Sequence, residues 1–138
     1  MARIWRVQMM SQFVDNFGPA PLNAFQGENP TYNSEKEAYY WMLAELAGDV
    51  GKIDTSVEPN DAEKKCDPAY GFNATNWKNY GISLRMRLAM RLSEADPTKA
   101  KSEFEAAVQQ GSGITTTEGT FRVQEYPGWD NWSGVMSR

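Results

Sequence analysis

The chain has 138 residues, enough for one domain with one core, and a formal net charge of −4. This charge argues against non-specific binding to nucleic acid, which requires a basic surface. Because the chain has no histidine, it lacks the commonest general base and metal ligand, and the single Cys66 excludes an internal disulfide and a thiolate zinc cage.

Neither a membrane span nor a signal peptide is recognisable. No apolar run approaches the roughly 20 residues that cross a bilayer. The first six residues lack the order of charged, apolar and small residues that marks a secretory signal. If the protein is exported, we expect its signal upstream of this chain.

The first predicted helix covers residues 2–16. Its inward positions recur at helical spacing, and Gly18 with the prolines after it should end the helix. Phe13 and Phe17 stand beside these inward positions. The inward set is Ile4, Val7, Met10 or Ser11, and Val14.

Ser34 is the expected N-cap of a second helix, followed by acidic residues in its first turn. Gly48 and Gly51 should weaken its end. Residues 54–75 are polar, contain two prolines, and predict a long loop. The apolar stripe of the second helix consists of Tyr39, Met42, Leu43, Leu46, Val50 and Ile53.

A third helix is expected over residues 77–93, with Asn76 as its N-cap. Its apolar arc is wide, so it should be the most buried helix. The residues of this arc are Trp77, Tyr80, Leu84, Leu88 and Leu92, flanked by Met86, Ala89 and Met90.

Asp96-Pro97 starts a fourth helix over residues 97–110, with Gly111 directly after its end. The connection is one tight turn, so the third and fourth helices should pack as antiparallel neighbours. The expected inward residues are Ala100, Phe104, Ala107 and Val108.

These elements predict an all-α fold of antiparallel helix pairs. Pairs of roughly 34 residues indicate a tetratricopeptide-like array, although the consensus Trp-Leu-Gly-Tyr pattern is absent. After Gly111 the chain is rich in Gly, Thr and Ser, and residues 115–123 could form a short strand or hairpin. The remaining residues, 126–138, are expected to be irregular.

The strongest candidate for a ligand site is the aromatic segment near the C-terminus. Indole faces could stack on the apolar face of a sugar ring, while the short polar side chains between them bind its hydroxyl groups. The alternative is that these aromatic residues are buried against neighbouring sequence, as large aromatics usually are. The candidate residues are Tyr126, Trp129, Asp130, Asn131 and Trp132.

Five arginines allow two interpretations. They could form an anion site, since Arg87 and Arg91 share a helix face. Alternatively, they pair with carboxylates across helices while their stems cover apolar surface. The arginines are Arg3, Arg6, Arg85, Arg87 and Arg91, and the expected partners are Glu37, Glu45 and Glu94.

No motif indicates catalysis, a cofactor or a metal. Residues 48–51 lack the Gly-Lys-Ser/Thr end of a phosphate loop, and the acidic residues at 61, 63 and 67 do not fit the calcium-loop register. A serine nucleophile would have no histidine as its base. We therefore expect a binding protein with no cofactor and no metal.

Three segments resemble the SusD/RagB family. Residues 13–21 are similar to its Asp-x-(aromatic)-Gly-x-x-Pro turn, and residues 29–39 to its Pro-x-Tyr-Asp-Ser helix start. Residues 76–91 resemble its Trp-x-x-(aromatic)-Ala-Asn-Ser-Leu-Arg-x-Arg-Leu-Ala-x-Arg helix, and residues 96–100 also fit the family's sequence after that helix. The matches cover residues 2 to about 115 in the family's order.

The resemblance implies a mainly helical, tetratricopeptide-like fold and a surface lipoprotein of the bacterial outer membrane. Such proteins cover a TonB-dependent, SusC-like transporter and deliver oligosaccharide or other nutrients to it. In this family the helix pairs mostly serve as scaffold and transporter-docking surface. A helical-repeat interaction scaffold without a ligand site of its own is the alternative.

Some features depart from the family's pattern. Its chains are several times longer and carry a lipidated N-terminal Cys, a role that the mid-chain Cys66 cannot take. Gly81-Ile82-Ser83 stands in place of Ala-Asn-Ser, and residues 67–73 keep only part of an Asp-x-x-Tyr-Gly-Gly-Asp pattern. These departures predict that residues 1–138 are one partial domain of a longer protein. When isolated, residues 1–138 should expose a large apolar patch.

Overall fold

The computed structural model describes residues 1–22 and 31–122, and this part of the chain is helical. Its residues form no strand, although an isolated antiparallel bridge joins Ala20 and Asn33. The predicted all-α class is confirmed. The helices are α1 (Ala2–Phe17), α2 (Glu35–Gly51), α3 (Asp61–Lys64), α4 (Ala74–Arg91) and α5 (Pro97–Gln110).

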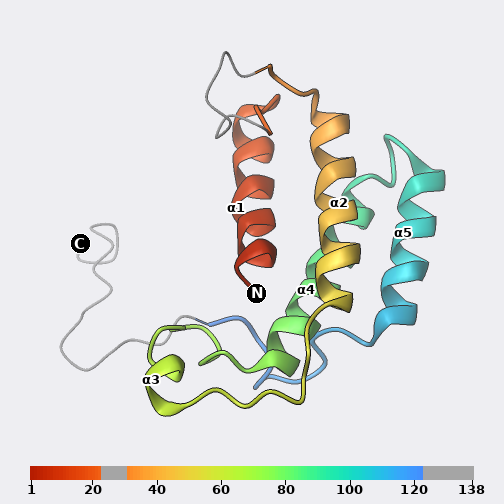
Figure 1. Ribbon diagram of the computed structural model, residues 1–138. Coiled ribbons are helices and arrows are strands. Elements are labelled where there is room, and N and C mark those ends of the chain that lie inside the picture. The colour runs from red at the N-terminus through yellow and green to blue at the C-terminus, as the bar shows by residue number, and fades with distance from the viewer. Residues whose placement is uncertain (23–30, 123–138) are drawn as a thin grey trace, which may run out of the picture.

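The four long helices run alternately up and down (Figure 1). α1 and α2 form one antiparallel pair, α4 and α5 form another, and α2 packs on α4 between them. The predicted antiparallel packing of the helices at 74–91 and 97–110 is confirmed. Because the turn after α4 is short, α5 packs antiparallel to α4.

The core lies where α1, α2 and α4 meet. Leu88 is fully buried, Leu84 is 2% exposed and Trp77 is 5% exposed, as the apolar arc predicted. Phe104 of α5 packs on this core but is only partly buried. Other large side chains that are almost fully buried are Ile4, Val7, Met42, Leu43, Leu46, Val50 and Ile82.

Side-chain caps determine where α2 and α4 begin. The predicted cap Ser34 forms a capping box with Glu37, in which each side chain accepts the other residue's backbone N–H. The predicted cap Asn76 is wrong. The Asn73 side chain accepts the N–H of Asn76, so α4 begins one turn earlier.

The predicted inward position of Val108 on α5 is also wrong, because this side chain is 51% exposed. Ala100 and Ala107 are buried as expected. The inward face continues instead through Glu103 and Gln110, which both bind Arg85 of α4. The side of α5 that faces α4 therefore carries Ala100, Glu103, Ala107 and Gln110, and Val108 lies outside it.

Two connecting segments differ from expectation. The predicted loop at 54–75 contains the one-turn helix α3, which Asn60 and Glu63 cap reciprocally. Residues 115–122, the described part of the predicted strand or hairpin, form only turns. Just before these residues, the Ser83 hydroxyl of α4 accepts the N–H of Ile114.

Candidate functional site

The predicted sugar site at Tyr126, Trp129, Asp130, Asn131 and Trp132 lies outside the described residues. The second described range ends at Arg122, directly after Phe121. Around Phe121 the described surface is aromatic.

Phe121 closes an aromatic pocket of about 320 Å³ at the N-terminal end of α1. Its ring stacks on Trp5, with 5.3 Å between centroids and 16° between planes. Trp5 remains 40% exposed. Met1, Ala2, Phe72, Trp77 and the loop at 66–69 complete the lining, so this hollow is mostly apolar, with Asp67 as its one acidic residue.

Asp67 is one of the residues that line this pocket, and it is 8% exposed. One carboxylate oxygen accepts the indole N–H of Trp77 at 2.6 Å and the N–H of Phe72 at 2.9 Å. The other accepts the N–H groups of Ala69 and Tyr70. Burial raises the pKa of Asp67, but these hydrogen bonds together lower it below its usual value.

Asp67 is therefore an ionised structural anchor for the loop and for the Trp77 ring, and its oxygens are occupied. Burial, with the neighbouring Tyr80 and Asp67, raises the pKa of Tyr70 to about 12, so this phenol is neutral. It donates to the carbonyl of Gly119 at 2.8 Å and ties the segment before Phe121 to the loop. The sequence signal for this anchor was the partial Asp-x-x-Tyr-Gly pattern.

The second candidate surface is the outer face of α1. An open groove of about 520 Å³ runs beside this helix, and its walls are mostly apolar. Sequence reasoning placed Phe13 and Phe17 beside the inward positions but did not identify the stripe that they share with Trp5 and Met9. The spacing of four residues was the available signal.

Of the two interpretations of the arginines, an anion site or pairing with carboxylates across helices, the structure supports pairing. Arg6 binds Glu45 at 2.6 Å, and Arg91 binds Asp15. Of the expected partners Glu45 is confirmed, whereas Glu37 caps its own helix. The remaining arginine contacts are Arg3 with Glu45 and Asp49, Arg85 with Glu103, and Arg87 with Gln8.

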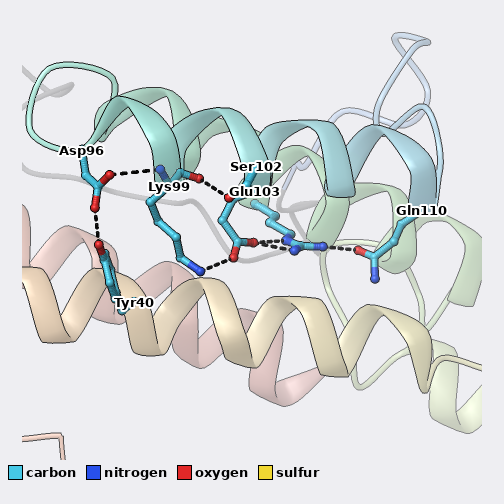
Figure 2. Close-up of polar contacts among 7 residues, drawn as sticks. Tyr40, Asp96, Lys99, Ser102, Glu103 and Gln110 are labelled. Atoms are coloured by element: carbon cyan, nitrogen blue, oxygen red, sulfur yellow. Dashed lines mark hydrogen bonds and ion pairs between the residues drawn. The ribbon is translucent and has the colours of Figure 1, made fainter.

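The buried Arg85 belongs to a polar network that joins α4, α5 and α2. Figure 2 shows its members from Tyr40 to Gln110. Glu103 binds Arg85 and, at 2.6 Å, Lys99. Burial raises the pKa of Glu103, but its two cationic partners hold it below the usual value. Gln110 extends the network to the carbonyl of Ala47, so these charges fasten α5 and do not form an open anion site.

At the other end of this network, the Tyr40 hydroxyl of α2 donates a hydrogen bond to Asp96. The Asp96 side chain also caps the start of α5. The hydrogen bond from Tyr40 lowers the pKa of Asp96 and raises that of Tyr40. Over residues 1–22 and 31–122, no group of three or more His, Cys, Asp or Glu side chains could hold a metal ion. Within the same ranges, no helix has the length and apolarity of a membrane span.

Comparison with known proteins identifies the family. Residues 1–134 match the SusD-like family model, described as SusD and RagB outer membrane lipoprotein. A SusD homologue from Bacteroides uniformis superposes with a TM-score of 0.82 at 26% identity, covering 92% of this chain and 27% of that one. Among curated proteins no match was found.

Two other solved relatives are more similar in sequence. A SusD homologue from Parabacteroides distasonis is 36% identical, with a TM-score of 0.71 over 80% of this chain and 22% of that one. A chitin-binding SusD homologue from Flavobacterium johnsoniae is 30% identical, with a TM-score of 0.74 over 86% of this chain and 26% of that one. The chain thus spans about a quarter of the length of these relatives, and it belongs to the SusD/RagB family of outer membrane lipoproteins.

Proposed function

We propose that this chain is one section of a non-enzymatic protein that captures oligosaccharide, or another nutrient, at the bacterial cell surface. The observation that carries the proposal is the family match over residues 1–134, together with the similarity to a chitin-binding homologue. In this proposal the complete protein is anchored in the outer membrane. Its helix pairs form the scaffold that docks a TonB-dependent, SusC-like transporter.

Sugar binding is proposed at Tyr126, Trp129, Asp130, Asn131 and Trp132. The described structure supports this location indirectly. A pyranose has an apolar C–H face and a rim of hydroxyl groups, and in the Trp5–Phe121 pocket the preceding chain already gathers aromatic rings. Capture needs no catalytic acid, because the glycan is bound and passed on intact.

A helical-repeat scaffold without a ligand site of its own is the second candidate. The observation that favours it is that the buried polar side chains already have hydrogen-bond partners within the protein. The carboxylate of Asp67 is saturated by N–H donors, and Arg85 is held by Glu103 and Gln110. The pocket that Asp67 lines is therefore better suited to apolar side chains than to hydroxyl groups.

Calorimetric titration of the complete protein with chito-oligosaccharides and a panel of plant and starch oligosaccharides separates the two candidates. Capture at the proposed site predicts that Trp129→Ala and Trp132→Ala each weaken binding at least about tenfold, or 1.4 kcal/mol. Tyr32→Ala is the matched control, since it removes an aromatic ring that is 67% exposed and lies outside the proposed site. Unchanged affinity in both tryptophan variants, with intact folds, would assign these residues a structural role.

A further inference from the structure

Residues 111–121, which follow α5, are fastened to the helical body, and we call this segment the strap. Its first fastening lies against α4, where the Ser83 hydroxyl accepts the N–H of Ile114 at 2.8 Å. Gly113 has a φ of 70°, and a Cβ atom on it would lie 2.6 Å from the Ser83 hydroxyl oxygen. Only glycine allows so close an approach in this backbone conformation.

Two further fastenings follow along the strap. Tyr70 donates its hydroxyl hydrogen to the carbonyl of Gly119 at 2.8 Å. The Phe121 ring is the last fastening, with its centroid 4.8 Å from that of Tyr80 on α4 and 5.3 Å from that of Trp5 on α1. Phe121 therefore ties the end of the strap to two helices at once.

The position of Phe121 matters for the segment that follows. The proposed sugar site begins at Tyr126, so four residues, 122–125, separate it from Phe121. An extended chain spans at most ~3.6 Å per residue, which keeps Tyr126 within about 18 Å of Phe121. Without the ring contacts the last fastening would be Gly119, and the connection would lengthen to six residues, 120–125. A shorter connection to a fixed point has less conformational entropy to lose when a ligand binds.

Phe121 borders the core without being part of its closely packed centre. Its ring is only partly buried, and its chain neighbours Thr120 and Arg122 are exposed. By contrast, Tyr80 beneath the ring is 7% exposed. A ring that fastens an exposed segment to a buried side chain determines where that segment lies, and its loss leaves the large buried side chains of the core in place.

We propose that Phe121 is a positioning residue for glycan binding. It fixes the point from which the chain reaches Tyr126, Trp129 and Trp132, and it raises affinity without touching the sugar. This role rests on the sugar site of the proposed function. It deepens that proposal, because preorganisation of a binding segment increases affinity without adding a contact to the ligand.

Calorimetric titration of the complete protein tests the positioning role. The probe is the oligosaccharide that the wild type binds most tightly among chito-, plant and starch oligosaccharides. Phe121→Ala removes the ring contacts, Phe121→Tyr keeps them, and Tyr70→Phe removes only the hydroxyl that binds Gly119. The control is Leu92→Ala, which truncates a side chain that is 7% exposed at the C-terminal end of α4, away from the strap. Each variant is titrated where circular dichroism shows it folded.

We expect Phe121→Ala to weaken glycan affinity about fivefold or more, and Tyr70→Phe about threefold. Phe121→Tyr and Leu92→Ala should stay within about twofold of the wild type. Tyr70→Phe keeps the test decisive if Phe121→Ala does not fold. Wild-type affinity in the folded Phe121 and Tyr70 variants, or equal losses in Phe121→Ala and Leu92→Ala, would overturn the positioning role and leave the sugar site standing.

A second comparison separates this proposal from the sugar site itself. When Trp129 and Trp132 are both replaced by alanine, Phe121→Ala should cause no further loss of affinity, because the segment that it positions no longer holds the sugar. An additional loss in that background would overturn the positioning role. Unchanged affinity on replacing the two tryptophans alone would overturn the sugar site, and the positioning role with it.

Discussion

Replacement of Gly81 by alanine tests the closest packing of α4 in the core. A Cβ atom at this position would lie 2.7 Å from Cγ2 of Val50 and 2.9 Å from Cδ1 of Ile4. Val50 is 1% exposed and Ile4 is fully buried, so neither has open space to move into. Val50 is also β-branched and therefore stiff at its first torsion.

Two effects oppose each other in Gly81→Ala. Alanine gains about 0.5–1 kcal/mol of helix stability over glycine, whereas overpacking a dense core costs about 1–3 kcal/mol. The net expectation is a loss of up to about 2.5 kcal/mol. The matched control is Gly48→Ala in α2, where nothing lies within 4 Å of the added atom, so the free energy of unfolding should rise by about 0.5–1 kcal/mol.

Urea unfolding of the wild type and both variants measures these changes, provided the slope of the transition stays constant. The two variants should move the midpoint in opposite directions. If Gly81→Ala stabilised the protein as much as Gly48→Ala does, the close approach of α4 to Val50 and Ile4 would be refuted.

Three further substitutions probe the core and its polar anchors. Leu88→Ala removes a fully buried side chain and should lower the free energy of unfolding by about 2–5 kcal/mol in urea, and a loss below about 1 kcal/mol would place Leu88 outside the core. Glu103→Ala leaves Arg85 buried without its carboxylate and should cost about 3–5 kcal/mol at neutral pH. The pKa of Glu103 is lowered in the folded protein, so the Glu103 carboxylate stabilises the fold at pH values above its ordinary pKa. This stabilisation disappears as the pH falls through the folded pKa. A difference in unfolding free energy between wild type and Glu103→Ala that does not change with pH would contradict this. Asp67→Asn turns one acceptor oxygen into a donor facing N–H groups and should cost about 1–3 kcal/mol with an altered fluorescence of Trp77, whereas an unchanged protein would contradict the anchor.

Periodicity and caps were sufficient to predict the long helices, because burial of one face and satisfaction of the first N–H groups are local in sequence. The start of α4 was misplaced because two asparagines, Asn73 and Asn76, both precede the apolar arc, and only the folded geometry shows which one accepts the hydrogen bond. The one-turn α3 carried a readable signal in the Asn60 and Glu63 capping box. Its four residues bury no side chain, so periodicity could not reveal it.

The candidate site was less accessible to sequence reasoning, because its contacts are distant along the chain. Trp5 and Phe121 stack although 116 positions separate them, and no local pattern links the two. The anchoring role of Asp67 depends on a loop that brings three backbone N–H donors together and on the indole N–H of Trp77 from α4. Val108 was misassigned because the inward side of α5 includes polar residues, Glu103 and Gln110, whose partner Arg85 lies on another helix.

The central claim is that this family member captures a glycan. A glycan array probed with the complete, folded protein tests that claim most directly. The account predicts binding to at least one class of oligosaccharide, lost when Trp129 and Trp132 are both replaced by alanine. A folded protein that binds no glycan or other nutrient, yet still associates with a TonB-dependent transporter, would contradict capture and leave the scaffold function.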